Sequence, residues 1–233
     1  MTPTTHELDV LIVGAGFSGM YLIYKMRELG LNALVLEAAP EVGGTWYFNR
    51  YPGARCDVES MEYSYSFSEE LQKEWNWPQK YSEQNEILEY ANHVADRFDL
   101  RSHIKFSTKV ISAKFDESIN MWNIRTDSGD VYITRYFIMA TGTLSVPNKP
   151  KFEGLDSFKG EWYMTGNWPH EEPDLKGKKV SGEVEGLHAR VMQHEFDHLN
   201  GILYTSRLAD KRAFGYSEEI EKFWKKNDED KSK

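Results

Sequence analysis

The chain has 233 residues, of which 40% are hydrophobic, so it is long enough to bury one large core or two small ones. Its formal net charge of -9 and its pI near 5.3 argue against a nucleic-acid groove or an anionic membrane surface, because both need clustered positive charge. We therefore expect small-molecule chemistry, with no nucleic-acid and no membrane partner.

Cysteine usage and the start of the chain bear on location. Cys56 is the single cysteine, so no disulfide can form within the chain. The opening MTPTTHELD lacks the basic and apolar regions of a secretory signal. The most apolar run, Val10 to Tyr24, is shorter than the ~20 residues needed to span a bilayer. These features predict a soluble protein in a reducing, cytoplasmic setting.

The first predicted unit is a strand, a helix and a second strand. Residues 8–13, LDVLIV, are a continuous apolar run typical of a strand buried on both faces of a parallel sheet. Apolar residues keep helical spacing from Met20 to Leu29, and Gly30 is a typical helix stop. Residues 31–37, LNALVLE, predict a second buried strand, which completes a βαβ unit.

The middle of the chain predicts a loop, a helix and three strands. Residues 38–68 are loop-like, whereas residues 83–98 have the spacing of an amphipathic helix. Three strand-like runs follow, at residues 109–116, 121–127 and 131–142. With the βαβ unit they predict an α/β fold, namely a Rossmann-like domain with a small antiparallel insertion that returns to the main sheet.

A glycine-rich motif lies between the first strand and the first helix. The segment Gly14-Ala15-Gly16-Phe17-Ser18-Gly19 is a GxGxxG, in which the first glycine permits a tight turn and the second lets a pyrophosphate approach the backbone. Glu37 ends the second strand, where a carboxylate can accept hydrogen bonds from ribose hydroxyls and would repel a 2'-phosphate. The motif predicts dinucleotide binding through Gly14, Gly16, Ser18, Gly19 and Glu37, without preference for NADP. A purely structural glycine turn is the alternative.

Further motifs identify the dinucleotide by resemblance. They are Glu41-Val42-Gly43-Gly44-Thr45-Trp46, Tyr51-Pro52-Gly53-Ala54-Arg55-Cys56-Asp57, Ala140-Thr141-Gly142, and Phe158-Lys159-Gly160 with Trp168-Pro169. From about residue 8 to about residue 179, the chain resembles the Baeyer-Villiger monooxygenases, in particular the phenylacetone monooxygenase type. The resemblance implies an FAD-binding domain and an enzyme that uses NADPH and O2 to insert oxygen beside the carbonyl of a small ketone.

The resemblance also implies roles for individual residues. Positions that would line the bound FAD are Thr45, Trp46, Asp57, Tyr63 and Val110. Arg55, Cys56 and Asp57 fall where the family's nicotinamide cofactor approaches the flavin. Asp57 would be a catalytic residue that orients the family's active-site arginine. The alternative for Asp57 is a loop cap.

Two departures from the family pattern stand out. Met164 occupies the position of a histidine in the family's fingerprint, and a thioether cannot donate a hydrogen bond or carry a proton as an imidazole does. After Val180 no second GxGxxG occurs, although the family continues there into its NADPH domain. We therefore expect an incomplete FAD sheet, and no detectable ketone oxygenation by this chain alone.

The sequence VMQHEFDHLNG, at residues 191–201, carries a different chemistry. His194 and His198 are four residues apart, so on a helix they share one face and could hold one Fe or Zn ion. Glu195 lies beside them, where a carboxylate can take a proton from metal-bound water. Two solvent-facing histidines on an amphipathic helix are the alternative.

The wider segment, residues 182–216, resembles the C-terminal motif of peptide deformylases. The resemblance implies His194 and His198 as metal ligands and Glu195 as the general acid and base. That family also needs a cysteine ligand in an EGCLS-type loop and a GxGxAAxQ segment, and neither occurs in this sequence.

The sequence therefore predicts a composite chain. Residues 1–145 would be the FAD-binding domain, 146–180 a linker with a degenerate monooxygenase fingerprint, 181–216 a deformylase-type metal-binding helix and strand, and 217–233 a charged tail. Three functions stay open: a flavin-dependent monooxygenase, a metal-dependent hydrolase, and a catalytically inactive FAD-binding chimera.

Overall fold

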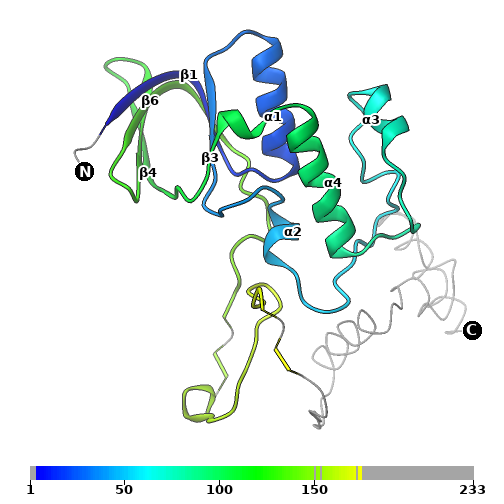
Figure 1. Ribbon diagram of the computed structural model, residues 1–233. Coiled ribbons are helices and arrows are strands. Elements are labelled where there is room, and N and C mark those ends of the chain that lie inside the picture. Colours follow the sequence, from blue (N-terminus) through cyan, green and yellow to red (C-terminus); the bar gives the residue numbers. More distant parts are fainter. Residues whose placement is uncertain (1–3, 150, 153, 172, 175–233) are drawn as a thin grey trace, which may run out of the picture.

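One six-stranded sheet organises the part of the chain that the structure describes, which is residues 4–149, 151–152, 154–171 and 173–174. In this computed structural model the strand order is β3-β2-β1-β6-β5-β4 (Figure 1). The strands are β1 (Thr5–Val13), β2 (Ala33–Leu36), β3 (Ile104–Lys105), β4 (Val110–Asp116), β5 (Met121–Thr126) and β6 (Val131–Met139). The α/β fold with a Rossmann-like sheet is thus confirmed.

The predicted βαβ unit is present. β1 pairs with β2 in parallel, and α1 (Phe17–Glu28) connects the two strands. The last residues of β1 are buried on both faces because the strand lies between β2 and β6. Leu29 caps the helix, and Gly30 follows with a φ of +69°, a left-handed conformation that favours glycine. The stop predicted at Gly30 is therefore correct.

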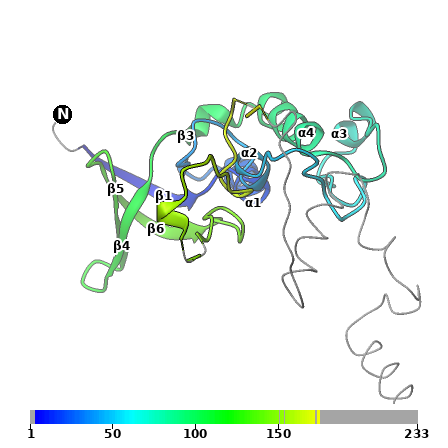
Figure 2. The same cartoon turned by 90° about the horizontal axis from the view of Figure 1, so that it is seen from below.

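β6 joins the antiparallel insertion to the parallel sheet. It pairs in parallel with β1 along the whole of both strands, from Thr5↔Val131 to Val13↔Met139. On its other edge it pairs antiparallel with β5, but only from Arg125↔Val131 to Trp122↔Thr134. The insertion is therefore continuous with the main sheet, and Figure 2 shows β4 and β5 at the end of the sheet away from α3 and α4.

Helices cover one part of the sheet and extend beyond it. α4 (Gln84–Arg97) confirms the predicted amphipathic helix, and Figure 1 places it beside α1, with α3 (Glu69–Glu74) further out. Two short helices were not predicted: α2 (Thr45–Phe48), which interrupts the predicted loop, and α3. Ser68 starts α3, since its hydroxyl accepts a hydrogen bond from the backbone N–H of Leu71.

The main core lies between the sheet and these helices. Its fully buried side chains come from β1, α1, β2 and α4, and they include Val10, Ile12, Met20, Ile23, Val35, Tyr90, Ala91 and Val94. On the opposite face of the sheet, Leu11, Leu36, Ile124 and Tyr132 form a smaller cluster. The core thus holds the end of β1 and the start of α1 rigidly, and the glycine motif lies between them.

After β6 the chain carries little regular structure. The described residues contain one 3-10 turn, η2 (Leu155–Ser157), and one isolated bridge between Met164 and Asn167. Within the described residues, no helix is long and apolar enough to cross a membrane. The segments predicted at residues 181–216 and 217–233 lie outside the described residues.

Candidate functional site

The glycine loop between β1 and α1 is closely packed against neighbouring backbone. Gly14 has a φ of +103°, and a Cβ atom there would lie 2.6 Å from the carbonyl oxygen of Ala140. A Cβ on Gly19 would lie 1.8 Å from the carbonyl oxygen of Gly14. Both positions therefore exclude any side chain, which is the packing role expected of the first and third glycines.

Gly16 is less constrained by the fold itself. A Cβ there would meet the Cα atom of Gly44 at 3.5 Å, which is an ordinary van der Waals distance. Gly16 is also the N-cap of α1; it provides no side-chain cap, and the first turn contains no acidic residue. The positive end of the helix dipole is therefore not compensated by a side chain in that turn, which suits an anionic group such as a pyrophosphate.

Glu37 is held by backbone N–H groups on both of its carboxylate oxygens. It follows β2 directly and is 5% exposed. Oε2 accepts a hydrogen bond from the N–H of Ala15 at 2.5 Å, and Oε1 accepts one from the N–H of Ala39 at 2.7 Å. The carboxylate thus joins the glycine loop to the loop after β2, next to the cavity described below.

A cavity of about 490 Å³ lies where these features meet. It is lined by eight of the predicted cofactor-binding residues: Gly14, Gly16, Ser18, Glu37, Thr45, Trp46, Tyr63 and Val110. Gly19 does not line it and instead lies against the backbone of Gly14. We refer to this as the first cavity.

Sequence reasoning missed other residues of the first cavity. They include Phe17, Phe48, Thr108, Lys109, Ser145 and Val146. Thr108 and Lys109 immediately precede β4, and the N–H of Thr108 donates to the carbonyl oxygen of Glu37. This pairing joins residues 71 positions apart, so no local pattern could have indicated it.

A second cavity of about 390 Å³ contains the other predicted residues. Arg55, Cys56 and Asp57 line it. Trp46 and Tyr63 line both cavities; the indole N–H of Trp46 donates to the Tyr63 hydroxyl at 2.8 Å, and their rings meet edge to face. Apart from Gly19, the predicted cofactor residues thus fall into two neighbouring cavities that share these two aromatic side chains.

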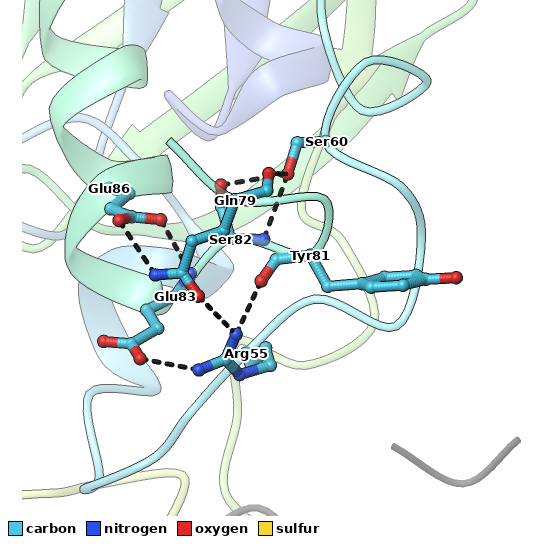
Figure 3. Close-up of polar contacts among 7 residues, drawn as sticks. All are labelled: Arg55, Ser60, Gln79, Tyr81, Ser82, Glu83 and Glu86. Atoms are coloured by element: carbon cyan, nitrogen blue, oxygen red, sulfur yellow. Dashed lines mark hydrogen bonds and ion pairs between the residues drawn. The ribbon is translucent and has the colours of Figure 1, made fainter. Parts of the chain in front are cut away.

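The three residues of the second cavity have different environments. Cys56 is 5% exposed, and burial raises the pKa of its thiol. Asp57 is exposed, and among the described residues its carboxylate has no hydrogen-bond or ion-pair partner, so a loop-cap role has no support there. Arg55 is largely buried and bonds to residues 79–83, while its Nε–H is buried without a partner in the described part of the chain (Figure 3).

The predicted metal site cannot be placed in this arrangement. His194, Glu195 and His198 lie outside the described residues. Met164 is described and forms an isolated bridge with Asn167. Its thioether cannot donate a hydrogen bond or carry a proton as an imidazole does.

The comparisons with known proteins agree with the Rossmann-like fold. The family described as pyridine nucleotide-disulphide oxidoreductase matches residues 11–174. The chain belongs to this family. A second family, polypeptide deformylase, matches the short segment 171–214.

Relatives within the pyridine nucleotide-disulphide oxidoreductase family are more specific. A Baeyer-Villiger monooxygenase of Pseudooceanicola batsensis is 48% identical over 175 residues, which is 75% of this chain and 32% of the relative. An acetone monooxygenase (methyl acetate-forming) of Gordonia sp. (strain TY-5) is 43% identical over 177 residues, covering 76% of this chain and 33% of the relative. The matched region therefore corresponds to the N-terminal part of flavin monooxygenases.

A solved structure shares the fold of this region. An oxidized steroid monooxygenase bound to NADP superposes with a TM-score of 0.70 at 54% sequence identity, over 73% of this chain and 33% of that one. The chain thus spans about a third of the length of the relatives that it matches.

Proposed function

We propose that this chain binds FAD in the first cavity and supplies the FAD-binding part of a Baeyer-Villiger-type monooxygenase. The single observation that supports the proposal most is the convergence of the glycine loop, the start of α1 and Glu37 on one cavity. The polar groups of the site fit the cofactor. The N–H groups at the helix N-terminus can donate hydrogen bonds to a pyrophosphate, and a carboxylate can accept hydrogen bonds from ribose hydroxyls.

Each part of the first cavity would have a distinct task. The backbone at Gly14 and Gly16 would approach the pyrophosphate, while Glu37, already oriented by two N–H groups, would accept hydrogen bonds from the ribose. Trp46 and Tyr63 would line the flavin and exclude water on that side. When bound, FAD would supply the redox chemistry through which NADPH and O2 oxidise a ketone.

The second cavity would then be the side on which NADPH and a small ketone approach. Arg55, Cys56 and Asp57 line it next to Trp46 and Tyr63. The Asp57 carboxylate, free of partners among the described residues, could orient a cationic side chain or the nicotinamide amide. The use of NADPH and of a ketone by this chain is inferred from relatives of which it covers only about a third.

The first experiment measures flavin retention. The full chain is incubated with FAD, gel-filtered, and its absorption recorded from about 350 to 500 nm; retained flavin bands are expected at one FAD per chain. Glu37→Gln should lose most of the flavin, whereas Glu28→Gln, an exposed acid at the far end of α1, should retain it. A colourless wild-type protein with an intact circular dichroism spectrum would refute the proposal.

A second candidate function rests on the deformylase match at residues 171–214. We propose that the chain is a composite, with an FAD-binding part at residues 1–145, a linker at 146–180, a deformylase-like segment at 181–216 and a charged tail. In that segment His194 and His198 would hold Zn or Fe, and Glu195 would act as the general acid and base.

Metal analysis tests this second function. One equivalent of Zn or Fe per chain is expected after gel filtration, and His194→Ala should abolish it, while the surface change His103→Ala should not. If metal is absent but flavin is retained, only the FAD-binding proposal stands. If both are absent, neither proposal stands.

A further inference from the structure

Arg55 forms a closed network of hydrogen bonds with the chain that leads into α4 (Figure 3). Its NH1 group donates to the side-chain oxygen of Gln79 at 2.9 Å and to the carbonyl oxygen of Tyr81 at 2.7 Å. Its NH2 group donates to the carboxylate of Glu83 at 2.6 Å. The guanidinium thus uses the planar fork that distinguishes arginine from lysine.

The same network fixes the start of α4. Glu83 and Glu86 form a capping box, in which the Glu86 carboxylate accepts from the N–H of Glu83. The side-chain amide of Gln79 donates to the other oxygen of Glu86 at 3.1 Å. Arg55 therefore lies on a ring of bonds that passes through Gln79, Glu86 and Glu83, so loss of Arg55 opens the ring.

Backbone bonds on both sides of Arg55 join the two segments as a short ribbon. The N–H of Cys56 donates to the carbonyl oxygen of Ser82 at 3.1 Å, and the N–H of Gln84 donates to that of Ala54 at 2.9 Å. The Ser60 hydroxyl continues the connection by bonding to Ser82. Residues 54–60, which carry Cys56 and Asp57 into the second cavity, are therefore attached to the start of α4.

Charge distinguishes Arg55 from a cofactor-binding arginine. Its side chain is 15% exposed, and the Glu83 carboxylate compensates its charge at 2.6 Å. A guanidinium paired in this way offers little net attraction to a phosphate. Only its Nε–H has no partner among the described residues.

We infer that Arg55 is a positioning residue, which holds the loop carrying Asp57 in the second cavity by clamping it to the start of α4. The inference rests on the proposed function in assigning the second cavity to the approach of substrate and NADPH. It does not require FAD to be bound, because every contact in the clamp is made by the chain itself.

Cys56 provides a probe inside the clamped loop. It is the single cysteine of the chain and is 5% exposed, so a thiol reagent reports only on this position. Since the thiolate is the reacting form, labelling of a protected thiol needs local opening of the loop. The rate of labelling by a disulfide reagent such as DTNB therefore measures how firmly the clamp holds.

The experiment compares the wild-type protein with four full-length variants, all without added FAD. Arg55→Ala is expected to label at least about tenfold faster than wild type, because the bonds to three groups are lost, and Arg55→Lys should lie between the two. Glu83→Gln, at a half-exposed position, should give a several-fold increase and keep the fold. Arg97 lies at the other end of α4 and forms an ion pair with Glu74 of α3. Arg97→Ala breaks that ion pair and should label as wild type does.

The pH profile separates positioning from general destabilisation. Wild-type labelling should rise only at a pH above the usual range for a thiol, since burial raises the pKa of Cys56. In Arg55→Ala the profile should move toward that of a free thiol, with melting temperature measured in parallel. Wild-type rates and an unchanged profile in both Arg55→Ala and Glu83→Gln would overturn the inference. Failure of flavin retention would instead count against the proposed function and leave the clamp intact.

Discussion

The carboxylate of Glu37 accepts a hydrogen bond of 2.5 Å from the backbone N–H of Ala15, 22 residues earlier in the chain. This bond crosses from the loop after β2 to the loop after β1, so it links the carboxyl ends of the two parallel strands. Glu37 therefore has a structural task as well as the proposed task in ribose binding, and the two can be separated by substitution.

Glu37→Ala should lower both stability and flavin affinity. It leaves the N–H groups of Ala15 and Ala39 without their acceptor, at a cost of about 1–3 kcal/mol for each buried group. Glu37→Gln keeps one acceptor oxygen, so it should lose less stability while still binding FAD poorly. Urea unfolding of both variants measures the difference, and equal stability of wild type and Glu37→Ala would contradict this account.

Replacing Gly19 should mainly lower stability, whereas replacing Gly16 should mainly lower FAD affinity. Gly19→Ala should cost about 3 kcal/mol or more, because the new Cβ would overlap the carbonyl of Gly14. Gly16→Ala should fold nearly as well as wild type, since its Cβ meets only an ordinary contact, but it should bind FAD more weakly by blocking the backbone. Gly30→Ala, with φ at +69° in open space, is the control and should cost about 1 kcal/mol.

Lys109 should strengthen flavin binding through its charge. It lines the first cavity and is exposed, so its attraction for a pyrophosphate is screened by salt. Lys109→Met should weaken FAD binding several-fold at low ionic strength, and the difference should vanish toward 1 M salt. Lys114→Met, on β4 and outside the first cavity, should bind FAD as wild type does at every salt concentration.

High pH should destabilise the fold through a buried tyrosine. Burial, with the neighbouring Tyr90 and Tyr63, raises the pKa of Tyr65 well above its usual value. The folded state therefore keeps the Tyr65 proton where the unfolded chain releases it. The stabilisation is complete below about pH 10 and is lost as pH rises toward the folded pKa, at up to about 1.4 kcal/mol per pH unit.

The variant Tyr65→Phe tests that dependence. It loses the hydrogen bond from the Tyr65 hydroxyl to the carbonyl oxygen of Phe17, so it should be less stable near neutral pH by about 1 kcal/mol. Its stability should then fall less steeply above pH 10 than that of wild type. Tyr136→Phe, at a position 52% exposed, should keep the wild-type slope, and equal slopes in all three proteins would argue against Tyr65.

The sequence was most informative where local patterns decide the structure. β1, α1 and β2 followed from apolar runs and Gly30, and α4 followed from its amphipathic spacing. β3 has two residues, which is too short for any periodic signal. α3 does have a local signal, because Ser68 followed by two glutamates is a typical helix start.

The candidate site likewise contains features that local sequence patterns predict and features that they do not. The glycine motif and Glu37 are local features of one βαβ unit, so their meeting at a cavity could be expected. The contacts of Arg55 could not be predicted from the sequence, because Arg55 and Glu83 are 28 residues apart and only the tertiary structure brings them together. Family resemblance placed Arg55 near a cofactor, while its observed partners are Gln79, Tyr81 and Glu83.

The close approach of Gly14 to Ala140 has a consequence for the order of events during synthesis. Ala140 donates its N–H to the carbonyl of Val13, and its own carbonyl covers Gly14. The first 36 residues emerge early, but this backbone contact forms only after β6 has left the ribosome, about 5–20 s later at typical rates of synthesis. During that interval the glycine loop of the nascent βαβ unit lacks the backbone contact that covers Gly14 in the folded protein.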